Sequence, residues 1–199
     1  MSENKLISNL LALSKAIEVP DALNKPSDNG VYRPLNLGSS IGIQVGKINN
    51  WDGGTYQEFI LGYDATLPIV YNPIKRNIDL FPLIIYLPKS KNPRWIYDAE
   101  EKEKDNGFDI IIRNHIDDSI KDALVDFAKV YPITTFGRID FRIKSTDKLL
   151  SDDILSQEIT MKDLFFVEMN SMPTIEPEDS FEFARVNFKY CVNLHYGVE

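Results

Sequence analysis

An apolar run over residues 164–167 ends in two side chains that carry oxygen, Glu168 and Asn170. Successive side chains of a β-strand point to opposite faces, so these residues, two positions apart, point to the same face. A second strand-like segment, residues 137–143, contains Asp140. If the two strands pair, the carboxylate of Asp140 joins Glu168 and Asn170 in one cluster of oxygen ligands.

The residue types in this cluster suit Mg²⁺, which proteins usually hold through one or two carboxylates together with substrate phosphates. Arg138 lies on the same strand face as Asp140, where its planar guanidinium would present paired donors to an anion. The pattern therefore favours phosphate-dependent chemistry. Two simpler interpretations stay open: the acidic residues are solvated strand ends, or Arg138 is only the ion-pair partner of Asp140.

The composition narrows the class of protein. With 199 residues, 43% of them apolar and 26% charged, the chain fits one soluble domain or two small lobes. A net charge of −8 without a Lys/Arg-rich tract argues against a nucleic-acid surface. The longest apolar runs, such as residues 80–87, fall short of the roughly 20 residues that a membrane-spanning helix needs.

The N-terminal 17 residues lack the apolar stretch and the cleavage site of a signal peptide, so we expect a cytoplasmic protein. The single cysteine, Cys191, excludes an internal disulfide and is most simply a small buried apolar residue. With only His115 and His195 besides it, a zinc site is disfavoured.

Hydrophobic periodicity predicts two helices and a series of strands. Residues 3–17 and 115–130 have apolar residues at helical spacing: Leu6, Ile7, Leu10, Leu13 and Ile17 in the first, and Ile116, Ile120, Leu124, Phe127 and Ala128 in the second. Strands are expected at residues 31–33, 43–48, 55–60, 65–71, 78–87, 136–143 and 163–168. The polar segment 88–109 is either a solvated loop or a functional flap. The sum is an α+β fold, an antiparallel sheet with flanking helices.

Four short segments, taken in order, resemble the ATP-grasp superfamily, most closely its D-alanine–D-alanine ligase branch. They are Arg-Pro-Leu-Asn-Leu-Gly-Ser-Ser-Ile-Gly at 33–42, Glu-Phe-Ile-Leu-Gly-Tyr-Asp-Ala-Thr at 58–66, Gly-Arg-Ile-Asp at 137–140 and Glu-Met-Asn-Ser-Met-Pro at 168–173. The resemblance implies a ligase that uses ATP and Mg²⁺ to convert a carboxylate of an amino acid or peptide into an acyl phosphate, which an amine then attacks.

The resemblance also assigns roles by position. The loop that touches phosphate and substrate would contain Ser39 and Ser40, whose small-residue backbone suits an anion. The segment that hydrogen-bonds adenine would be Gln57, Glu58, Phe59 and Ile60. Asp64 would reach the ribose hydroxyls.

The resemblance assigns the metal-binding and catalytic residues in the same way. Asp140, Glu168 and Asn170 occupy the metal-ligand positions, and Arg138 the position of the arginine that steadies the charged intermediate. The loop that closes over the site would run from Tyr97 to about Lys102, with Lys102 as the candidate lid lysine.

The chain also departs from the family pattern. Arg33 replaces the family's phosphate-binding lysine, and Thr174 replaces a glycine after the final proline. Residues 43–54 are too few for the usual strand–helix–strand, so the small nucleotide lobe is shortened. We expect no segment of residues 1–199 to correspond to the family's N-terminal substrate domain. We expect a helix and linker at 1–30, a reduced small lobe at about 31–62 and a large lobe at about 63–199.

Two functions follow from these observations. The first is an ATP- and Mg²⁺-dependent carboxylate–amine ligase whose missing substrate domain comes from a second chain or a second copy of this one. The second is a degenerate module that binds nucleotide or a partner protein without its own catalysis.

Overall fold

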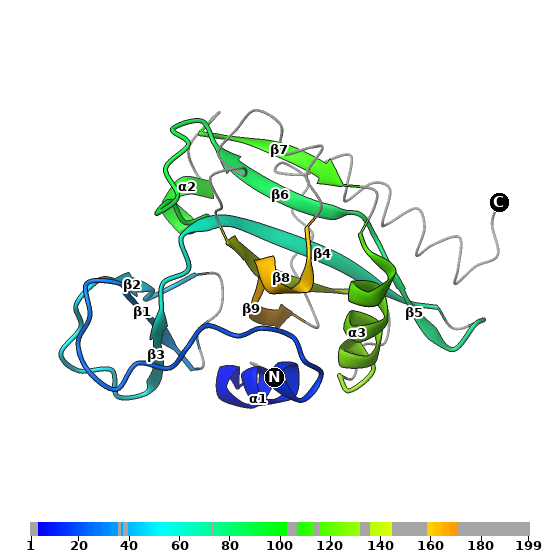
Figure 1. Ribbon diagram of the computed structural model, residues 1–199, viewed down its shortest axis with the longest axis horizontal. Coiled ribbons are helices and arrows are strands. Elements are labelled where there is room, and N and C mark those ends of the chain that lie inside the picture. Colours follow the sequence, from blue (N-terminus) through cyan, green and yellow to red (C-terminus); the bar gives the residue numbers. More distant parts are fainter. Residues whose placement is uncertain are drawn as a thin grey trace.

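The computed structural model describes residues 4–35, 37, 40–72, 74–102, 107–113, 116–131, 136–144 and 159–170, with the side chains of residues 99 and 102 excepted. Within these ranges the chain forms two antiparallel sheets and flanking helices (Figure 1). The α+β fold expected from the sequence is confirmed. None of the helices in the described ranges is long and apolar enough to cross a membrane.

The larger sheet has six strands in the order β7-β6-β4-β8-β9, with β5 also paired to β4. Its strands are β4 (Gly62–Asn72), β5 (Asn77–Leu80), β6 (Leu83–Pro88), β7 (Phe108–Arg113), β8 (Phe136–Lys144) and β9 (Leu164–Asn170). The long central strand β4 pairs with β8 over nine residue pairs, from Gly62 opposite Lys144 to Val70 opposite Phe136. This pairing fixes the position of β8, and β9 pairs on its far side.

The smaller sheet lies at one end of the molecule, at the left in Figure 1. It has the order β2-β1-β3, with β1 (Gly30–Pro34), β2 (Gln44–Val45) and β3 (Gly54–Glu58). The chain passes from this sheet into the larger one across residues 59–61.

Two helices contribute to one core with the larger sheet. In α1 (Lys5–Ser14), the Asn4 side chain accepts hydrogen bonds from the backbone N–H groups of Leu6 and Ile7 and caps the N-terminus. In α3 (Asp118–Ala128), Asp117 caps the helix. The expected apolar face of α3 is confirmed, because Ile120, Leu124, Phe127 and Ala128 are buried and Ile116 is buried just before the helix.

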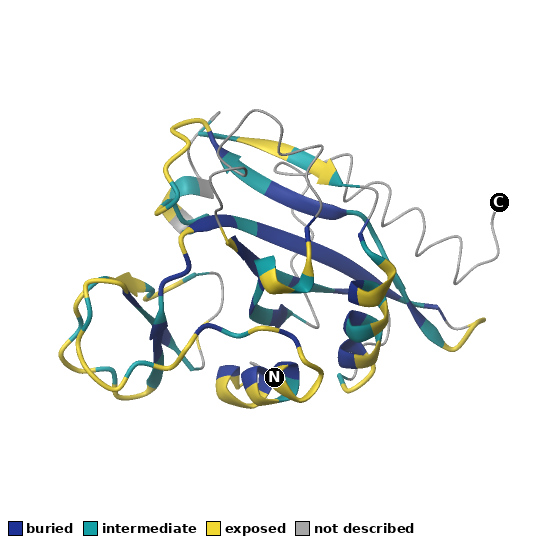
Figure 2. Cartoon of the chain, in the orientation of Figure 1, coloured by how far each residue is buried: buried dark blue, intermediate teal, exposed yellow. Residues whose placement is uncertain are grey.

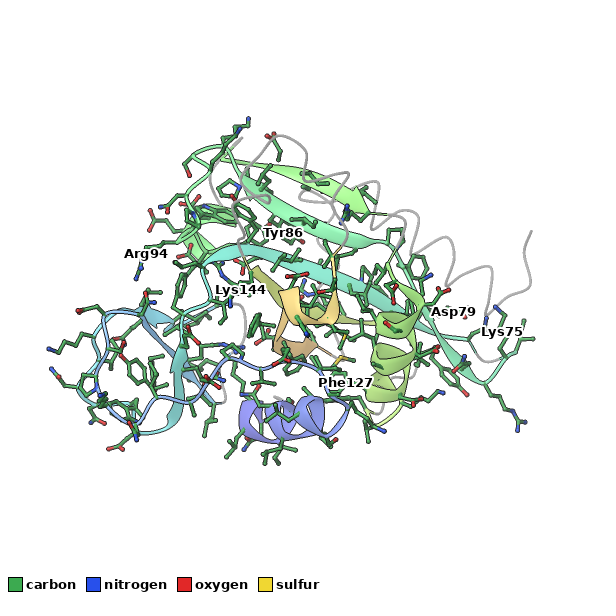
Figure 3. The ribbon with its side chains drawn as sticks, in the orientation of Figure 1. Lys75, Asp79, Tyr86, Arg94, Phe127 and Lys144 are labelled. Carbon is green, nitrogen blue, oxygen red and sulfur yellow. The ribbon has the colours of Figure 1, made fainter. Side chains whose placement is uncertain are left out.

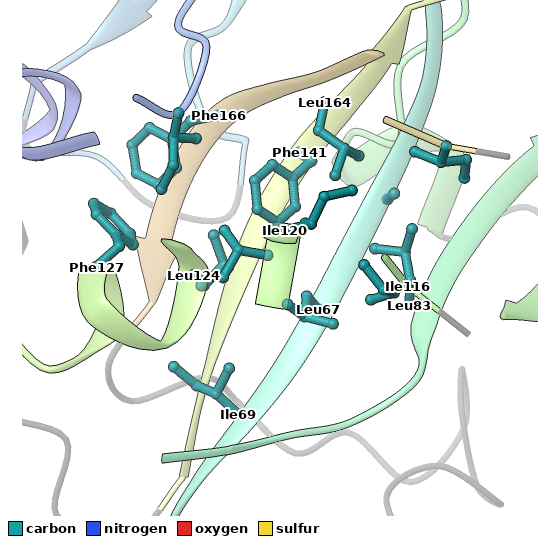
Figure 4. Packing of buried hydrophobic residues seen from close by; sticks show 14 of the residues in the cluster. Leu67, Ile69, Leu83, Ile116, Ile120, Leu124, Phe127, Phe141, Leu164 and Phe166 are labelled. Carbon is teal, nitrogen blue, oxygen red and sulfur yellow. The ribbon is translucent and has the colours of Figure 1, made fainter. Parts of the chain in front are cut away.

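The core lies between these helices and one face of the larger sheet (Figure 4). Alternate residues of the strands point into it, and this group comprises Ala65, Leu67 and Ile69 of β4, Ile139, Phe141 and Ile143 of β8, and Leu164, Phe166 and Met169 of β9. The intervening residues of β8, Arg138, Asp140 and Arg142, therefore lie on the opposite face. Because one face of the sheet is buried, the register of its strands is fixed, and the polar residues lie together on the other face.

Two predicted strands were wrong in detail, and one strand was missed. The predicted strand 78–87 is two strands, because Pro82 lacks the N–H that a continuous ladder needs. Strand β7 was not predicted, and the short helix α2 (Ala99–Lys102) lies inside the expected flap. The predicted strand 43–48 is reduced to β2, a two-residue pairing with β1.

Candidate functional site

The polar cluster predicted from the sequence forms across the pairing of β8 and β9. Asp140 lies directly opposite Glu168, and Arg138 lies opposite Asn170, so the expected pairing of the two strands is confirmed. Directly opposed residues of an antiparallel pair point to the same face. All four side chains therefore lie on the face of the sheet opposite the core.

A register shift in β9 produces this alignment. Phe166 pairs with Phe141, whereas the next pair along is Glu168 with Asp140, so Val167 is the extra residue of a β-bulge. The bulge lets Phe166 enter the core while Glu168, two residues later, lies on the polar face. Without it, the alternation of an unbroken strand would place both side chains on one face.

Asp140 is held by two donors. The hydroxyl of Thr66 on β4 donates to its Oδ1 at 2.6 Å, and Arg138 Nε lies 3.1 Å from Oδ1 and 3.2 Å from Oδ2. Burial raises the pKa of the Asp140 carboxyl, Arg138 lowers it, and the nearby charge of Glu168 raises it further. The balance is a raised pKa, with burial as its largest cause.

Glu168 faces two cations from other elements. Lys5 Nζ, at the start of α1, lies 3.7 Å from Glu168 Oε2, and Arg33 Nη2, on β1, lies 3.4 Å from the same oxygen. Both basic side chains are buried, and burial is the main cause that lowers the pKa of each. Sequence reasoning missed Lys5. The available signal was a lone basic residue directly after the helix cap of an otherwise apolar helix.

Lys5 and Arg33 also connect the candidate phosphate loop to this cluster. Lys5 Nζ donates to the backbone oxygen of Leu37 at 2.6 Å, and Arg33 stands just before the loop. Ser40 is partly exposed and has a positive φ of 61°, a conformation that non-glycine residues seldom adopt. Ser39 lies outside the described residues.

The polar groups of the expected adenine segment form hydrogen bonds within the chain. The N–H groups of Glu58 and Phe59 donate to the backbone oxygens of Asp21 and Asn29, each at 2.8 Å. Gln57 is buried, and its Nε2 donates to the Pro20 oxygen at 2.9 Å. The Ile60 oxygen accepts from Arg142 Nε at 2.8 Å.

Asp64, the expected ribose contact, is also engaged. Its Oδ1 accepts from Arg142 Nη1 at 2.9 Å, and its Oδ2 accepts from the backbone N–H of Tyr97 at 2.7 Å. Arg142 Nη2 donates to the oxygens of Gly62 and Pro93, each at 2.9 Å. Arg142, which the sequence reasoning did not single out, thus connects the passage between the two sheets at residues 60–62 to Pro93 in the segment after β6.

An aromatic cluster flanks the polar face. Tyr86 of β6 stacks on Tyr97 at 4.3 Å between ring centroids, and Phe108 packs edge-on against both (Figure 3 labels Tyr86). Burial raises the pKa of Tyr86, and Asp140 and Arg138 are among the charges that act on it. Tyr97, in the expected flap, is therefore held against Tyr86 by stacking and against Asp64 by a hydrogen bond. Lys102 belongs to α2, and its side chain is outside the described part.

Within the described ranges, no three His, Cys, Asp or Glu side chains gather in a group that could hold a metal ion. The three expected metal ligands are not such a group, because they comprise two carboxylates, Asp140 and Glu168, and the amide of Asn170.

No protein-family model matches the chain, and no curated protein matches it. Solved structures do. The D-alanine–D-alanine ligase from Bacillus anthracis complexed with ATP aligns with a TM-score of 0.59 and 15% identity, over 97% of this chain and 65% of that one. A Chryseobacterium gregarium RiPP-associated ATP-grasp ligase, in complex with ADP and a leader and core peptide, aligns with a TM-score of 0.62 and 12% identity, over 100% and 61%.

The macrocyclase MdnC from Microcystis aeruginosa, bound with precursor peptide MdnA, aligns with a TM-score of 0.55 and 14% identity, over 99% of this chain and 62% of that one. The chain thus spans less than two thirds of the length of these enzymes. The alignments cover 97–100% of this chain, and they show that the chain has the fold of the ATP-grasp ligases.

Proposed function

We propose that this chain is the nucleotide- and metal-binding part of an ATP- and Mg²⁺-dependent carboxylate–amine ligase that acts on an amino acid or a peptide. One observation carries the proposal: Asp140 and Glu168 lie opposite each other on a face that also receives Arg138, Arg33 and Lys5. The peptide-bound and ATP-bound ligases of the same fold support this substrate class and this nucleotide.

The donor set fits a magnesium ion. Two carboxylates on one sheet face repel each other, and this repulsion contributes to the raised pKa of Asp140. A divalent cation next to them would remove that repulsion, and oxygen ligands are the kind that Mg²⁺ prefers. Asp140, Glu168 and Asn170 would hold the ion, and the bound ion and ATP together would supply charge neutralisation at the transferred phosphate.

The chain's own residues would then position and stabilise the reacting groups. Arg138, whose guanidinium already lies beside Asp140, would donate to an anionic oxygen on the same face. Arg33 and Lys5 would compensate phosphate charge from the side of the smaller sheet. Ser40, with Ser39, would bring backbone N–H groups to the phosphates. Lys102 would serve as the lid lysine.

A second candidate function, nucleotide or partner binding without catalysis, is favoured by a different observation. Asp64 is held by Arg142 and by the N–H of Tyr97, and the N–H groups of Glu58 and Phe59 donate within the chain. The groups expected to bind ribose and adenine therefore have internal partners. Nucleotide binding through Glu58, Phe59 and Asp64 would require these bonds to exchange.

The test is calorimetric titration with ATP and Mg²⁺, followed by measurement of ADP release in the presence of amino acids and dipeptides. We expect Asp140→Asn and Glu168→Gln each to weaken Mg²⁺-dependent ATP binding at least tenfold. The matched control is Asp126→Asn on α3, which removes an exposed carboxylate paired with Lys129.

The outcomes separate the two functions. No binding at millimolar ATP overturns the ligase and supports binding of a partner protein without nucleotide. Binding without ADP release under any substrate mixture selects the second candidate. ADP release that is equally fast in the wild type and in Asp140→Asn contradicts the assigned role of the carboxylate pair.

A further inference from the structure

Residues 93–97, which follow β6 and precede α2, form a strap between the larger and the smaller sheet (Figure 3 labels Arg94). Arg94 Nη1 donates to Asn29 Oδ1 at 3.0 Å, and its Nη2 donates to the backbone oxygen of Asp28 at 3.1 Å. Both acceptors directly precede β1 of the smaller sheet. The strap is therefore a second connection between the sheets, besides the chain itself.

The end of the strap at Pro93 is held by several hydrogen bonds. The Pro93 oxygen accepts from the backbone N–H of Gly62 at 2.8 Å and from Arg142 Nη2 at 2.9 Å. Arg142 is buried, and Arg94, the next residue of the strap, adds its two bonds to the smaller sheet. We call this the anchored end.

The other end of the strap, at Tyr97, is held by fewer contacts. Its backbone N–H donates to Asp64 Oδ2 at 2.7 Å, and its ring stacks on Tyr86. Tyr97 is also partly exposed, and Figure 2 shows half-buried and exposed residues between β6 and α2 beside the buried strand β4. Segments with few buried contacts open locally at a lower cost than the core. The end at Tyr97 therefore opens more readily than the anchored end.

Asp64 lies on the same face of the larger sheet as Asp140. Its neighbours on β4, Tyr63 and Ala65, point into the core, so the Asp64 carboxylate points to the opposite face. That face carries the candidate site. A ligand bound there through hydroxyl groups would find in Asp64 a charged acceptor with two oxygens.

Both oxygens of Asp64 already have donors. Oδ1 accepts from Arg142 Nη1, and Oδ2 accepts from the N–H of Tyr97. A ligand that donates to both oxygens must displace at least one of these donors. Arg142 is buried and held by three backbone oxygens besides Asp64, so the donor that leaves at the lower cost is the N–H of Tyr97.

We propose that the bond from Tyr97 to Asp64 is an autoinhibitory contact, which the ribose hydroxyls of a bound nucleotide break, releasing the Tyr97 end of the strap while the anchored end stays in place. This inference rests on the proposed function, because it takes a nucleotide as the ligand. The released end leads into α2, which contains Lys102. Occupancy of the ribose position and the position of the expected lid are then coupled, since the ligand favours the released state.

The experiment compares ATP with dideoxy-ATP, which keeps the base and the phosphates and lacks both ribose hydroxyls. Amide hydrogen exchange of Tyr97 is measured in the full chain, alone and with each nucleotide and Mg²⁺, after calorimetry has fixed saturating concentrations. We expect ATP to accelerate the exchange of the Tyr97 amide about tenfold, as the loss of one hydrogen bond implies, and dideoxy-ATP to leave it unchanged. The amides of α3 are the internal control and should not respond to either nucleotide.

A variant tests the same contact without a ligand. In Asp64→Ala the Tyr97 amide loses its acceptor, so it should exchange without nucleotide as fast as the wild type does with ATP. The matched control is Asp126→Ala, which removes an exposed carboxylate of α3 and should leave the Tyr97 amide slow.

Trp95 gives a second measurement of the released state. Its ring lies 5.9 Å from that of Tyr97, and its indole N–H donates to Glu101 at 2.8 Å. The other tryptophan, Trp51, stacks on Tyr56 in the smaller sheet, so Trp51→Phe leaves Trp95 as the only indole. In that background ATP should shift the emission to longer wavelength, because the ring becomes more exposed, and dideoxy-ATP should not.

The outcomes separate this inference from the proposed function. If calorimetry finds no ATP binding, the proposed function and this inference are both overturned. If ATP binds and the Tyr97 amide stays slow, or if both nucleotides accelerate it equally, only the autoinhibitory contact is overturned. A slow Tyr97 amide in Asp64→Ala also overturns the contact, whatever the nucleotides do.

Discussion

The guanidinium of Arg33 donates a hydrogen bond of 2.6 Å to the backbone oxygen of Val167. Arg33 belongs to β1 of the smaller sheet, and Val167 is the bulged residue of β9 in the larger sheet. A bulge leaves one residue outside the regular ladder, so its carbonyl is available to a donor from elsewhere. The irregularity that aligns Glu168 with Asp140 thus also provides the acceptor that ties the two sheets together.

Replacement of Arg33 by methionine should lower the free energy of unfolding by about 3 kcal/mol. The change removes a buried charge and leaves the Val167 oxygen without this donor, while Glu168 keeps only Lys5. Urea unfolding followed by circular dichroism measures the loss. Lys121→Ala, which breaks an exposed ion pair with Asp118, should change stability by no more than about 0.5 kcal/mol. Equal effects of the two changes would contradict the proposed role of Arg33.

Arg142 should be more sensitive to a conservative change than its charge alone suggests. Its guanidinium donates to Ile60, Gly62, Pro93 and Asp64, and its planar fork matches these acceptors in a way that an ammonium does not. We expect Arg142→Lys to cost about 2–4 kcal/mol of unfolding free energy.

The matched change is Lys144→Ala, at the exposed end of the same strand, where Lys144 lies over the Phe165 ring at 5.9 Å. Its cost should stay below about 1 kcal/mol. Denaturant midpoints with unchanged slopes give both values. If Arg142→Lys and Lys144→Ala had equally small effects on stability, the connection between the two sheets would not depend on the planar guanidinium of Arg142.

The sequence was sufficient to predict the parts of this protein that have a regular hydrophobic period. The buried face of α3 and the polar face of β8 were predicted correctly. Apolar residues that repeat every 3.6 positions in a helix, or every 2 in a strand, leave few alternatives for which face is buried. The pairing of Asp140 with Glu168 followed from the expected contact between their strands.

The parts that could not be predicted depend on long-range contacts. The bulge at Val167 is not encoded by alternation, and its acceptor is used by a residue 134 positions away. Lys5 and Arg142 act through partners in distant segments, so no local pattern marks them. Helix α1 was predicted correctly, but the direction of its apolar face was not evident, because periodicity does not say which face meets the sheet.

A third prediction concerns the smaller sheet. A Cβ added at Gly30 would overlap the ring of Tyr56, whose hydroxyl lies 2.8 Å from the Ser27 oxygen and 2.9 Å from the Gly46 oxygen and can donate to either. Gly30→Ala should therefore displace the ring and cost about 1–3 kcal/mol. Gly53→Ala is the comparison, because Gly53 has a φ of 76° with open space around it. It should show only the conformational cost of about 1 kcal/mol.

The measurement for Gly30→Ala should include local opening as well as global stability. Amide hydrogen exchange of residues in β1 and β3 should accelerate in Gly30→Ala, while the exchange of β4 and β8 should change less, because the smaller sheet opens on its own. Uniform acceleration in both sheets would show that they unfold as one unit and would contradict this expectation.

The last prediction uses the raised pKa of Asp140. Because its carboxyl binds a proton more tightly in the folded chain than at the ordinary value of 3.8, its contribution to stability is greatest at low pH and decreases as the pH rises through the folded-state pKa. Asp140→Asn removes this dependence. The stability of the wild type relative to the variant should therefore fall as the pH rises above the ordinary carboxyl pKa of 3.8, as measured by urea unfolding at each pH.

Added Mg²⁺ should change the same difference in stability between the wild type and Asp140→Asn. A divalent cation near Asp140 and Glu168 favours the charged carboxylate and lowers its pKa, so added Mg²⁺ should flatten the pH dependence of the wild type and leave Asp140→Asn unaffected. Ca²⁺ and a monovalent salt at equal ionic strength are the controls for ion selectivity and for screening. If the wild type and Asp140→Asn followed parallel pH profiles with and without Mg²⁺, the carboxylate pair would be an ordinary element of the sheet surface and would not hold an ion.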